Sequence, residues 1–224
     1  MRKVLIFARL DLLTIKSYLT WKVMLLFAAV CAAVGYGTGD TAVIVGLCML
    51  YGVIFSSYPF AVGEKSALDT LYITLPVSKK QIVAGRYLFS FCLTLTALAL
   101  SCILSFILMT VLGKEFDLAL TLISALVCFL LFSLIEAIQM PIYYKFGYTK
   151  AKFLTHIPLI AFPAATIIVS TLVGKNNLMP LVTNAMAWVE ANMALTSIFA
   201  VVLWVVIMFS SAALSYRLYR KREF

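Results

Sequence analysis

Residues 118–140 have the sequence LALTLISALVCFLLFSLIEAIQM, an apolar run with one ionisable side chain, Glu136. About 20 apolar residues in a helix cross the hydrocarbon core of a bilayer. A transmembrane β-strand needs only about 10 residues, and these alternate between polar and apolar. The run is long and does not alternate, so it predicts a membrane-spanning helix.

Similar apolar runs fill most of the remaining chain. The predicted spans are 21–39, 41–62, 87–112, 118–142, 154–174 and 194–215. The 224 residues are 64% hydrophobic and 12% charged, whereas soluble domains are about half apolar and about a quarter charged. This composition excludes a soluble enzyme, a disordered chain and a secreted disulfide scaffold. We predict an all-α integral membrane protein with six transmembrane helices, folded as a single domain over residues 1–224.

The basic residues lie almost entirely on one side of these spans. Of the 18 Lys and Arg residues, only Lys114 and Lys175 fall in the connections on the other side. Cytoplasmic loops carry an excess of cations, so both termini are predicted to be cytoplasmic. Juxtamembrane cations facing anionic lipid also account for the net charge of +9 without any nucleic-acid partner.

Residues 1–20 have a pattern of their own. Arg2, Arg9 and Lys16 recur every seven residues and form one stripe on a helix, while most other positions are apolar. This pattern predicts a helix lying in the membrane interface, with its cations at the lipid headgroups. The alternative is a helix that simply extends the first span into the cytoplasm.

The connection between spans 2 and 3, residues 63–86, carries helix signals. Ser66 and Asp69 have the spacing of a capping box, and Pro76 ends the helix that would follow. One face of that helix is apolar: Leu68, Leu71, Tyr72 and Leu75. Ser78 and Gln81 form a second capping box, from which a helix runs into span 3. The short helix is either a docking element for a cytosolic partner or an interfacial helix that touches only lipid headgroups.

Two segments resemble the permease subunits of the type-2 ABC transporter family, of the small bacterial exporter type. The first is AVGEKSALDTLYITLPVSKKQIVAGRYL, residues 61–88. The residues that fill its motif are Glu64, Leu68, Asp69, Leu71, Leu75, Pro76, Val77, Ser78, Lys79 and Lys80. The second is MPIYYKFGYTKAKFL, residues 140–154, with Pro141, Tyr143, Lys145, Phe146, Gly147 and Lys150.

The resemblance implies a complete transporter made of several chains. Residues 63–86 would carry the coupling helix, Tyr72 included, which sits in a groove of a separate cytosolic ABC ATPase present in two copies. A second permease chain, identical or paralogous, would complete the assembly in a bacterial cytoplasmic membrane. No GxxxxGK[ST] motif occurs, so the chain is expected to be no enzyme itself and to hold no cofactor, with ATP and Mg on the ATPase. Residues 175–193 would form short extracellular re-entrant helices.

Polar groups inside the spans are few. Glu136 and, one turn later, Gln139 lie near the predicted cytoplasmic end of span 4. Glu136 is interpreted either as an ion-pair partner of Lys145 or Lys152 or as a polar contact at the inner mouth of a transport pathway. Small residues at helical spacing in span 3 predict a seam where another helix packs closely. They are Ser90, Thr94, Ala97, Ser101 and Ser105.

The scarcity of charge inside the spans disfavours an ion channel or a proton-driven transporter, which need ionisable relays in the membrane. The resemblance implies an ABC exporter that works by alternating access. The uncharged spans fit an amphipathic or hydrophobic cargo, such as an antimicrobial or amphipathic peptide or a hydrophobic drug. Two alternatives stay open. One is the substrate-binding membrane subunit of a vitamin-uptake complex, and the other is a non-transporting membrane scaffold or sensor.

Overall fold

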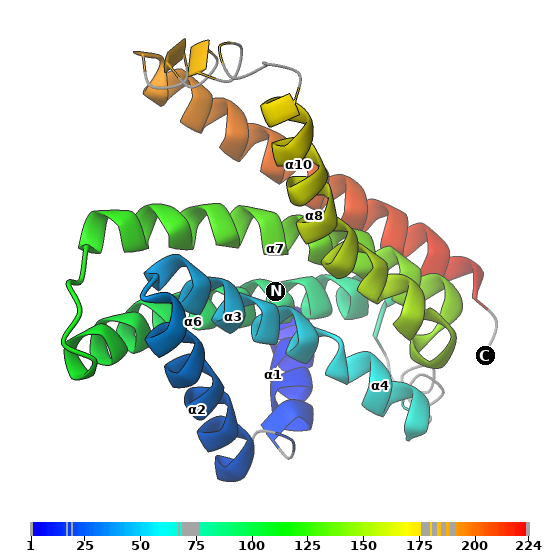
Figure 1. Ribbon diagram of the computed structural model, residues 1–224. Coiled ribbons are helices and arrows are strands. Elements are labelled where there is room, and N and C mark those ends of the chain that lie inside the picture. The colour runs from blue at the N-terminus through cyan, green and yellow to red at the C-terminus, as the bar shows by residue number, and fades with distance from the viewer. Residues whose placement is uncertain are drawn as a thin grey trace.

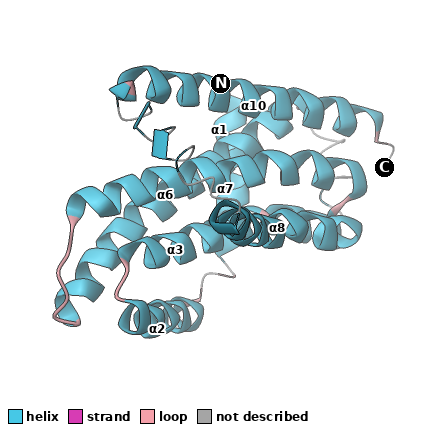
Figure 2. Ribbon diagram, turned by 45° about the horizontal axis from the view of Figure 1, so that its top comes forward, coloured by secondary structure: helices cyan, strands magenta, loops and turns pink. Residues whose placement is uncertain are grey.

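The computed structural model describes residues 2–16, 18, 20–66, 68, 77–175, 180, 183–184, 187–188 and 191–222. Within these ranges the regular secondary structure is helical throughout (Figure 2). The helices are α1 (Arg2–Lys16), α2 (Trp21–Thr38), α3 (Thr41–Ser56), α4 (Tyr58–Lys65), α6 (Lys79–Val111), α7 (Leu118–Phe146), α8 (Tyr148–Lys175) and α10 (Met193–Lys221). The prediction of an all-α protein is confirmed.

Several of these helices have the length and composition of membrane spans. Five candidates are Trp21–Thr38, Thr41–Lys65, Lys79–Val111, Leu118–Phe146 and Met193–Lys221. The sixth predicted span, 154–174, falls inside α8, whose side chains from residue 162 onward lie almost wholly outside the described part. The segment 175–193 is described only at scattered residues, so the sixth span and the re-entrant helices stay predictions.

The centre of the bundle is formed by α3, α6 and α7. Val45 and Met49 of α3 pack against Ala97 of α6 and Ala125 of α7 in one buried cluster. A Cβ at Gly52 would lie 3.1 Å from the Cβ of Ala97, so the backbones of α3 and α6 approach closely. The seam residues of α6 are all buried: Ser90, Thr94, Ala97, Ser101 and Ser105. The prediction of a close-packing seam in span 3 is confirmed.

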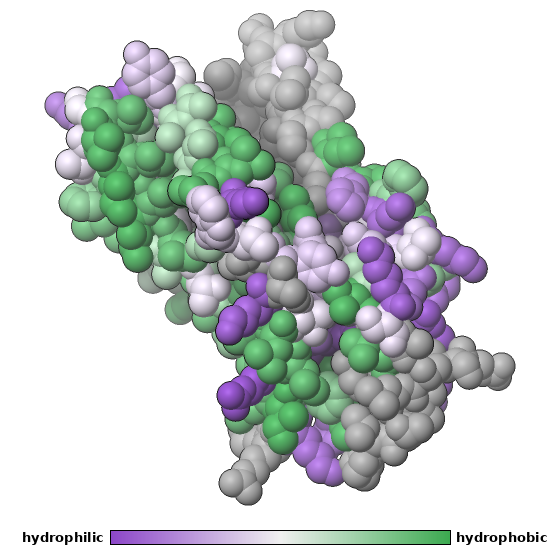
Figure 3. All heavy atoms as spheres, turned by 90° about the horizontal axis from the view of Figure 1, so that it is seen from below, coloured by the Kyte–Doolittle hydropathy of each residue, from purple (hydrophilic) through white to green (hydrophobic). Residues whose placement is uncertain are grey.

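The connections segregate to opposite ends of the bundle. At one end the ammonium of Lys114, in the α6–α7 loop, donates to the backbone carbonyls of Gly35 at 3.3 Å and Tyr36 at 2.8 Å. At the other end lie α4, the α7–α8 corner and the C-terminal turn of α10 (Figure 1). We call this second region the basic end, because most of the cations lie in its connections. Figure 3 shows hydrophilic side chains gathered mainly toward that end, with apolar ones over the opposite half of the same face.

Helix α1 packs across the start of α6 at a steep angle (Figure 1). Phe7, Asp11 and Ile15 are buried, whereas apolar residues on the other faces, such as Leu5 and Leu12, are more than half exposed. A Cβ at Gly85 would lie 2.6 Å from the Cβ of Phe7, so only glycine allows this approach. Because α1 ends at Lys16 and α2 begins at Trp21, the first helix does not continue into the second.

Candidate functional site at the basic end of the bundle

The predicted coupling segment is described only at its two ends. Asp69, Leu71, Tyr72, Leu75 and Pro76 lie outside the described residues. Ser66 ends α4, and its amide donates to the carbonyl of Val62 at 2.9 Å. The helix that Ser66 is predicted to cap lies outside the described residues.

Both ends of this segment pack on one buried cluster, which we call the basal cluster. Leu68 and Val77, on either side of residues 69–76, contact it as partly buried side chains. The cluster itself consists of Phe7, Phe60, Ile82, Val83, Met140, Tyr143, Tyr144, Ala151 and Tyr219. It contains residues of α1, α4, α6, α7, α8 and α10, so the predicted coupling segment leaves from and returns to the point where six helices meet.

Glu64, at the end of α4, contacts the start of α8. Its Oε2 accepts a hydrogen bond from the backbone amide of Thr149 at 3.0 Å. The first amides of a helix have no partner within the helix and carry partial positive charge, so a carboxylate at this position stabilises the start of α8. The structure brings Glu64 to the α7–α8 corner, and its predicted part in ATPase coupling stays a prediction.

The start of α6 contacts the C-terminal turn of α10. The ammonium of Lys79 donates to the carbonyls of Arg220 at 3.3 Å and Arg222 at 3.5 Å. The ammonium of Lys80 lies 5.3 Å from the ring centroid of Tyr216. Ser78 and Gln81 form the predicted capping box, with distances of 3.4 Å from the Gln81 amide to Ser78 Oγ and 3.2 Å from the Ser78 amide to Gln81 Oε1.

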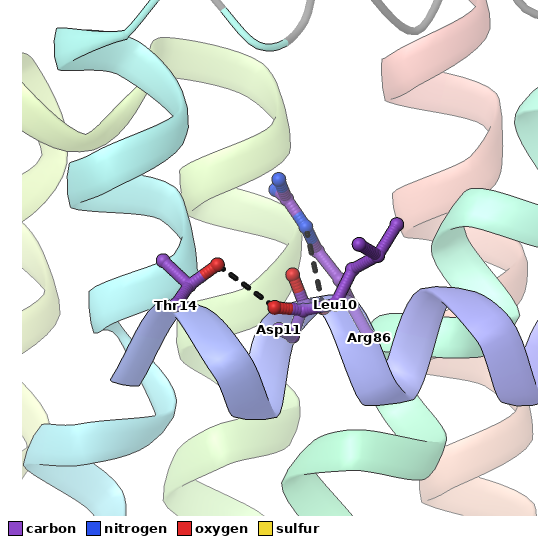
Figure 4. Close-up of polar contacts among 4 residues, drawn as sticks. All are labelled: Leu10, Asp11, Thr14 and Arg86. Carbon is purple, nitrogen blue, oxygen red and sulfur yellow. Dashed lines mark hydrogen bonds and ion pairs between the residues drawn. The ribbon is translucent and has the colours of Figure 1, made fainter. Parts of the chain in front are cut away.

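A buried ion pair fixes α1 to this region (Figure 4). Arg86 Nε lies 3.9 Å from Asp11 Oδ2, and both side chains are about 95% buried. The guanidinium of Arg86 also lies 4.3 Å from the ring centroid of Phe60. Burial raises the pKa of Asp11 to about 6, and the positive charge of Arg86 opposes that rise.

The sequence analysis did not assign a role to this pair. Its signal is the position of Asp11, four residues after Phe7 and four before Ile15, which places an acid in the apolar stripe that faces α6. A carboxylate in a buried stripe indicates a cationic partner on the facing helix. Arg9 and Lys16, predicted to face headgroups, are exposed, while the side chain of Arg2 lies outside the described part.

Glu136 does not pair with a lysine in the structure. The ammonium of Lys145 lies over the ring of Phe146 and that of Lys152 over the ring of Phe153. Glu136 is only 2% exposed and is enclosed between α3, α6 and α7, where its Oε2 lies 3.1 Å from Thr94 Oγ1. The interpretation of Glu136 as an ion-pair partner of Lys145 or Lys152 is therefore wrong, because its side chain points into the bundle and away from the interface.

The hydrogen bonds around Thr94 bear on the proton of Glu136. Thr94 Oγ1 lies 2.8 Å from the carbonyl oxygen of Ser90, which can only accept. A threonine hydroxyl has one proton, so it either shares that proton between the carbonyl and Glu136 Oε2, or donates to the carbonyl and accepts from a protonated Glu136 carboxyl.

Glu136→Gln is accordingly expected to leave the fold and its thermal stability in detergent almost unchanged, because the amide NH₂ can donate to Thr94 in place of the carboxyl OH. Glu136→Ala removes the bond and is expected to cost about 1–3 kcal/mol. Thermal unfolding of the two purified variants checks this expectation. Equal destabilisation by both changes would show that the buried group is ionised.

Gln139, one turn after Glu136, connects α7 to α8. Its Nε2 donates to the carbonyl of Thr155 at 2.8 Å, and Tyr143 donates to the hydroxyl of the same threonine at 2.9 Å. Tyr87 connects α6 to α10 in the same way, with its hydroxyl 2.7 Å from Ser211 Oγ and 2.8 Å from Ser215 Oγ. These hydroxyl and amide contacts bind the long helices to one another without using charge.

Several long apolar helices, with cations concentrated at one end of the bundle, define a polytopic membrane protein. Residues 9–220 match the model of a family described as ABC-2 family transporter protein, and the chain belongs to this family. It is therefore a membrane permease component of an ABC transporter, with no catalytic role of its own, and the family implies an ABC ATPase as partner. No curated protein and no solved structure shows a significant match to the chain. The predicted type-2 ABC permease is confirmed.

Proposed function

We propose that the chain is the membrane subunit of an ATP-driven exporter that works by alternating access. Two cytosolic ATPase subunits and a second permease chain, identical or paralogous, complete the transporter. The observation that supports this best is the attachment of both described ends of the coupling segment to the basal cluster. A movement imposed on a loosely attached loop would not reach the membrane helices, whereas a movement of this segment displaces side chains that six helices share.

The surfaces inside the membrane support a proposal for the class of cargo. Glu136 is enclosed by neighbouring helices and offers no exposed charge to an ionic cargo. Along the middle of α6 and α7 most of the exposed side chains are apolar, among them Leu95, Leu100, Ile103, Phe106, Ile107, Leu120, Leu122, Ile123 and Leu126. We infer an amphipathic or hydrophobic cargo, such as an antimicrobial peptide or a hydrophobic drug.

Co-expression with a candidate ABC ATPase tests this function. The ATPase is expected to co-purify with the chain, and a set of amphipathic peptides is expected to stimulate ATP hydrolysis in reconstituted vesicles and to be moved by them. If the ATPase co-purifies stably but no hydrophobic compound stimulates ATP hydrolysis or is transported, a membrane scaffold is favoured. A chain that retains no ATPase would contradict the exporter.

The topology gives a separate prediction. In a variant without the five native cysteines, a single cysteine at position 176 is expected to react with an impermeant reagent outside intact cells, and one at position 79 is not. The reason is the concentration of cations in the connections that include Lys79. Permeabilised cells, in which both positions should react, are the control. Labelling of position 79 in intact cells would contradict cytoplasmic termini and the six-span arrangement.

A further inference from the structure

The α7–α8 corner is built tightly around the Glu64 carboxylate. Gly147, between the two helices, has φ +77°, a conformation that other residues rarely adopt. A Cβ at this position would lie 3.0 Å from Glu64 Oε2 and 3.1 Å from Nη2 of Arg222. The end of α4, the start of α8 and Arg222, just after α10, therefore meet at one point, which we call the corner contact.

The electrostatics of the corner contact are favourable. The amide of Thr149 donates to Glu64 at 3.0 Å, and the positive charge of Arg222 also acts on this carboxylate. A carboxylate at the N-terminus of a helix interacts with the partial positive charge of its free amides, here those of the 28-residue helix α8. Glu64 thus holds α8 through a charge-assisted hydrogen bond, which is stronger than a neutral one.

The other end of the coupling segment contacts the same C-terminal turn. Lys79 donates to the carbonyls of Arg220 and Arg222, and its ammonium lies 5.7 Å from the ring centroid of Tyr219. Arg222 therefore acts at both ends of the segment, on Glu64 through the positive charge of its side chain and on Lys79 through its carbonyl. A displacement of the segment would act on α8 and α10 together.

We propose that Glu64 is a positioning residue that transmits the movement of the coupling segment to α8. This inference rests on the proposed function, since the ATPase supplies the movement. When the end of α4 shifts, the carboxylate carries the first turn of α8 with it, because the amide of Thr149 has no helical partner to take its place. Lys79 and Arg222 add α10 to the same moving unit.

The test compares Glu64→Ala with Lys65→Ala, a neighbouring exposed cation of α4, in the permease–ATPase complex in lipid nanodiscs. Hydrogen–deuterium exchange is measured over residues 148–152, with and without ATP plus vanadate. In the absence of nucleotide, the backbone amides in the first turn of α8 are expected to exchange roughly fivefold faster in Glu64→Ala than in the wild type, because the variant loses a helix cap. The nucleotide-dependent change in exchange seen in the wild type should also disappear, although the ATPase stays bound.

Two further variants separate transmission from folding. Glu64→Gln keeps an oxygen that accepts from Thr149 but loses the charge, so its exchange is expected to lie between the wild type and Glu64→Ala. Gly147→Ala would push a methyl group against Glu64 and Arg222, and is expected to abolish the nucleotide-dependent change as Glu64→Ala does.

The outcomes are distinct. If Glu64→Ala keeps the wild-type response to ATP plus vanadate, Glu64 is at most a local cap and the proposed transmission is wrong. If the first turn of α8 never responds in a wild-type complex that binds the ATPase, the transmission is equally wrong while the exporter stands. If the wild-type chain retains no ATPase, the proposed function itself fails.

Discussion

Leu71→Asp is expected to release the ATPase, or to uncouple ATP hydrolysis from export, without lowering the amount of permease in the membrane. Leu68, Leu71, Tyr72 and Leu75 form the predicted apolar face, which needs a partner surface to bury it. Truncation of an anchor residue in such a contact costs about 2 kcal/mol or more, which weakens binding about thirtyfold. Pull-down of the ATPase with the variant, together with peptide-stimulated hydrolysis, measures the effect.

Ser66→Ala is the matched control, because it changes the same segment without touching the apolar face. Loss of a cap costs about 1 kcal/mol, so the effect on ATPase binding should be milder than that of Leu71→Asp. Full binding and full stimulation with Leu71→Asp would show that this helix is not the docking site. The ATPase would then have to act through residues 145–153, which the corner contact joins to Glu64.

Arg86→Ala is expected to loosen α1 from α6 and to lower the stability of the purified protein by about 3–5 kcal/mol. The change removes the partner of the buried Asp11 and the cation that packs on Phe60. Thermal unfolding in detergent, with limited proteolysis of the N-terminal segment, measures the loss. Arg9→Ala, which removes an exposed cation of α1, should change stability by no more than about 0.5 kcal/mol.

The dependence on pH distinguishes a lost ion pair from lost packing. Because the pKa of Asp11 is raised from 3.8 to about 6, protonation favours the folded state. The contribution of Asp11 to the free energy of unfolding is thus largest below pH 4 and declines as the pH rises through about 6. Without Arg86 this decline should become larger. The stability of Arg86→Ala should therefore be closer to that of the wild type at pH 5 than at pH 8. A loss of stability that does not vary with pH would mean that Arg86 acts by packing alone.

The double variant Asp11→Leu with Arg86→Met provides the complementary test. Replacing a buried ion pair by apolar side chains of similar size is often neutral, so most of the lost stability should return. If the double variant is as unstable as Arg86→Ala, the pair itself is required to hold α1 in place.

The sequence alone identified the features that depend on residues close together in the chain. A helix of spanning length follows from local hydropathy, and the capping box of Ser78 and Gln81 follows from a spacing of three residues. The seam of α6 follows from the helical repeat of small side chains. The distribution of lysine and arginine separated the connections into two sets. The α6–α7 loop of one set and the α7–α8 corner of the other lie at opposite ends of the bundle.

The environments of individual charges depended on which helices became neighbours. The Glu136 side chain points inward, toward Thr94. Its position along span 4 gives its depth in the membrane but not this direction. The direction depends on how the helix is rotated about its axis against its neighbours. Asp11 meets Arg86 across 75 positions of the chain, and Glu64 meets Thr149 across 85. A local sequence pattern cannot indicate a pairing between residues so far apart in the chain. Only the packing of α1, α4, α6 and α8 around the basal cluster brings these groups together. Asp11 is buried and therefore requires a partner, which Arg86 on the facing helix supplies.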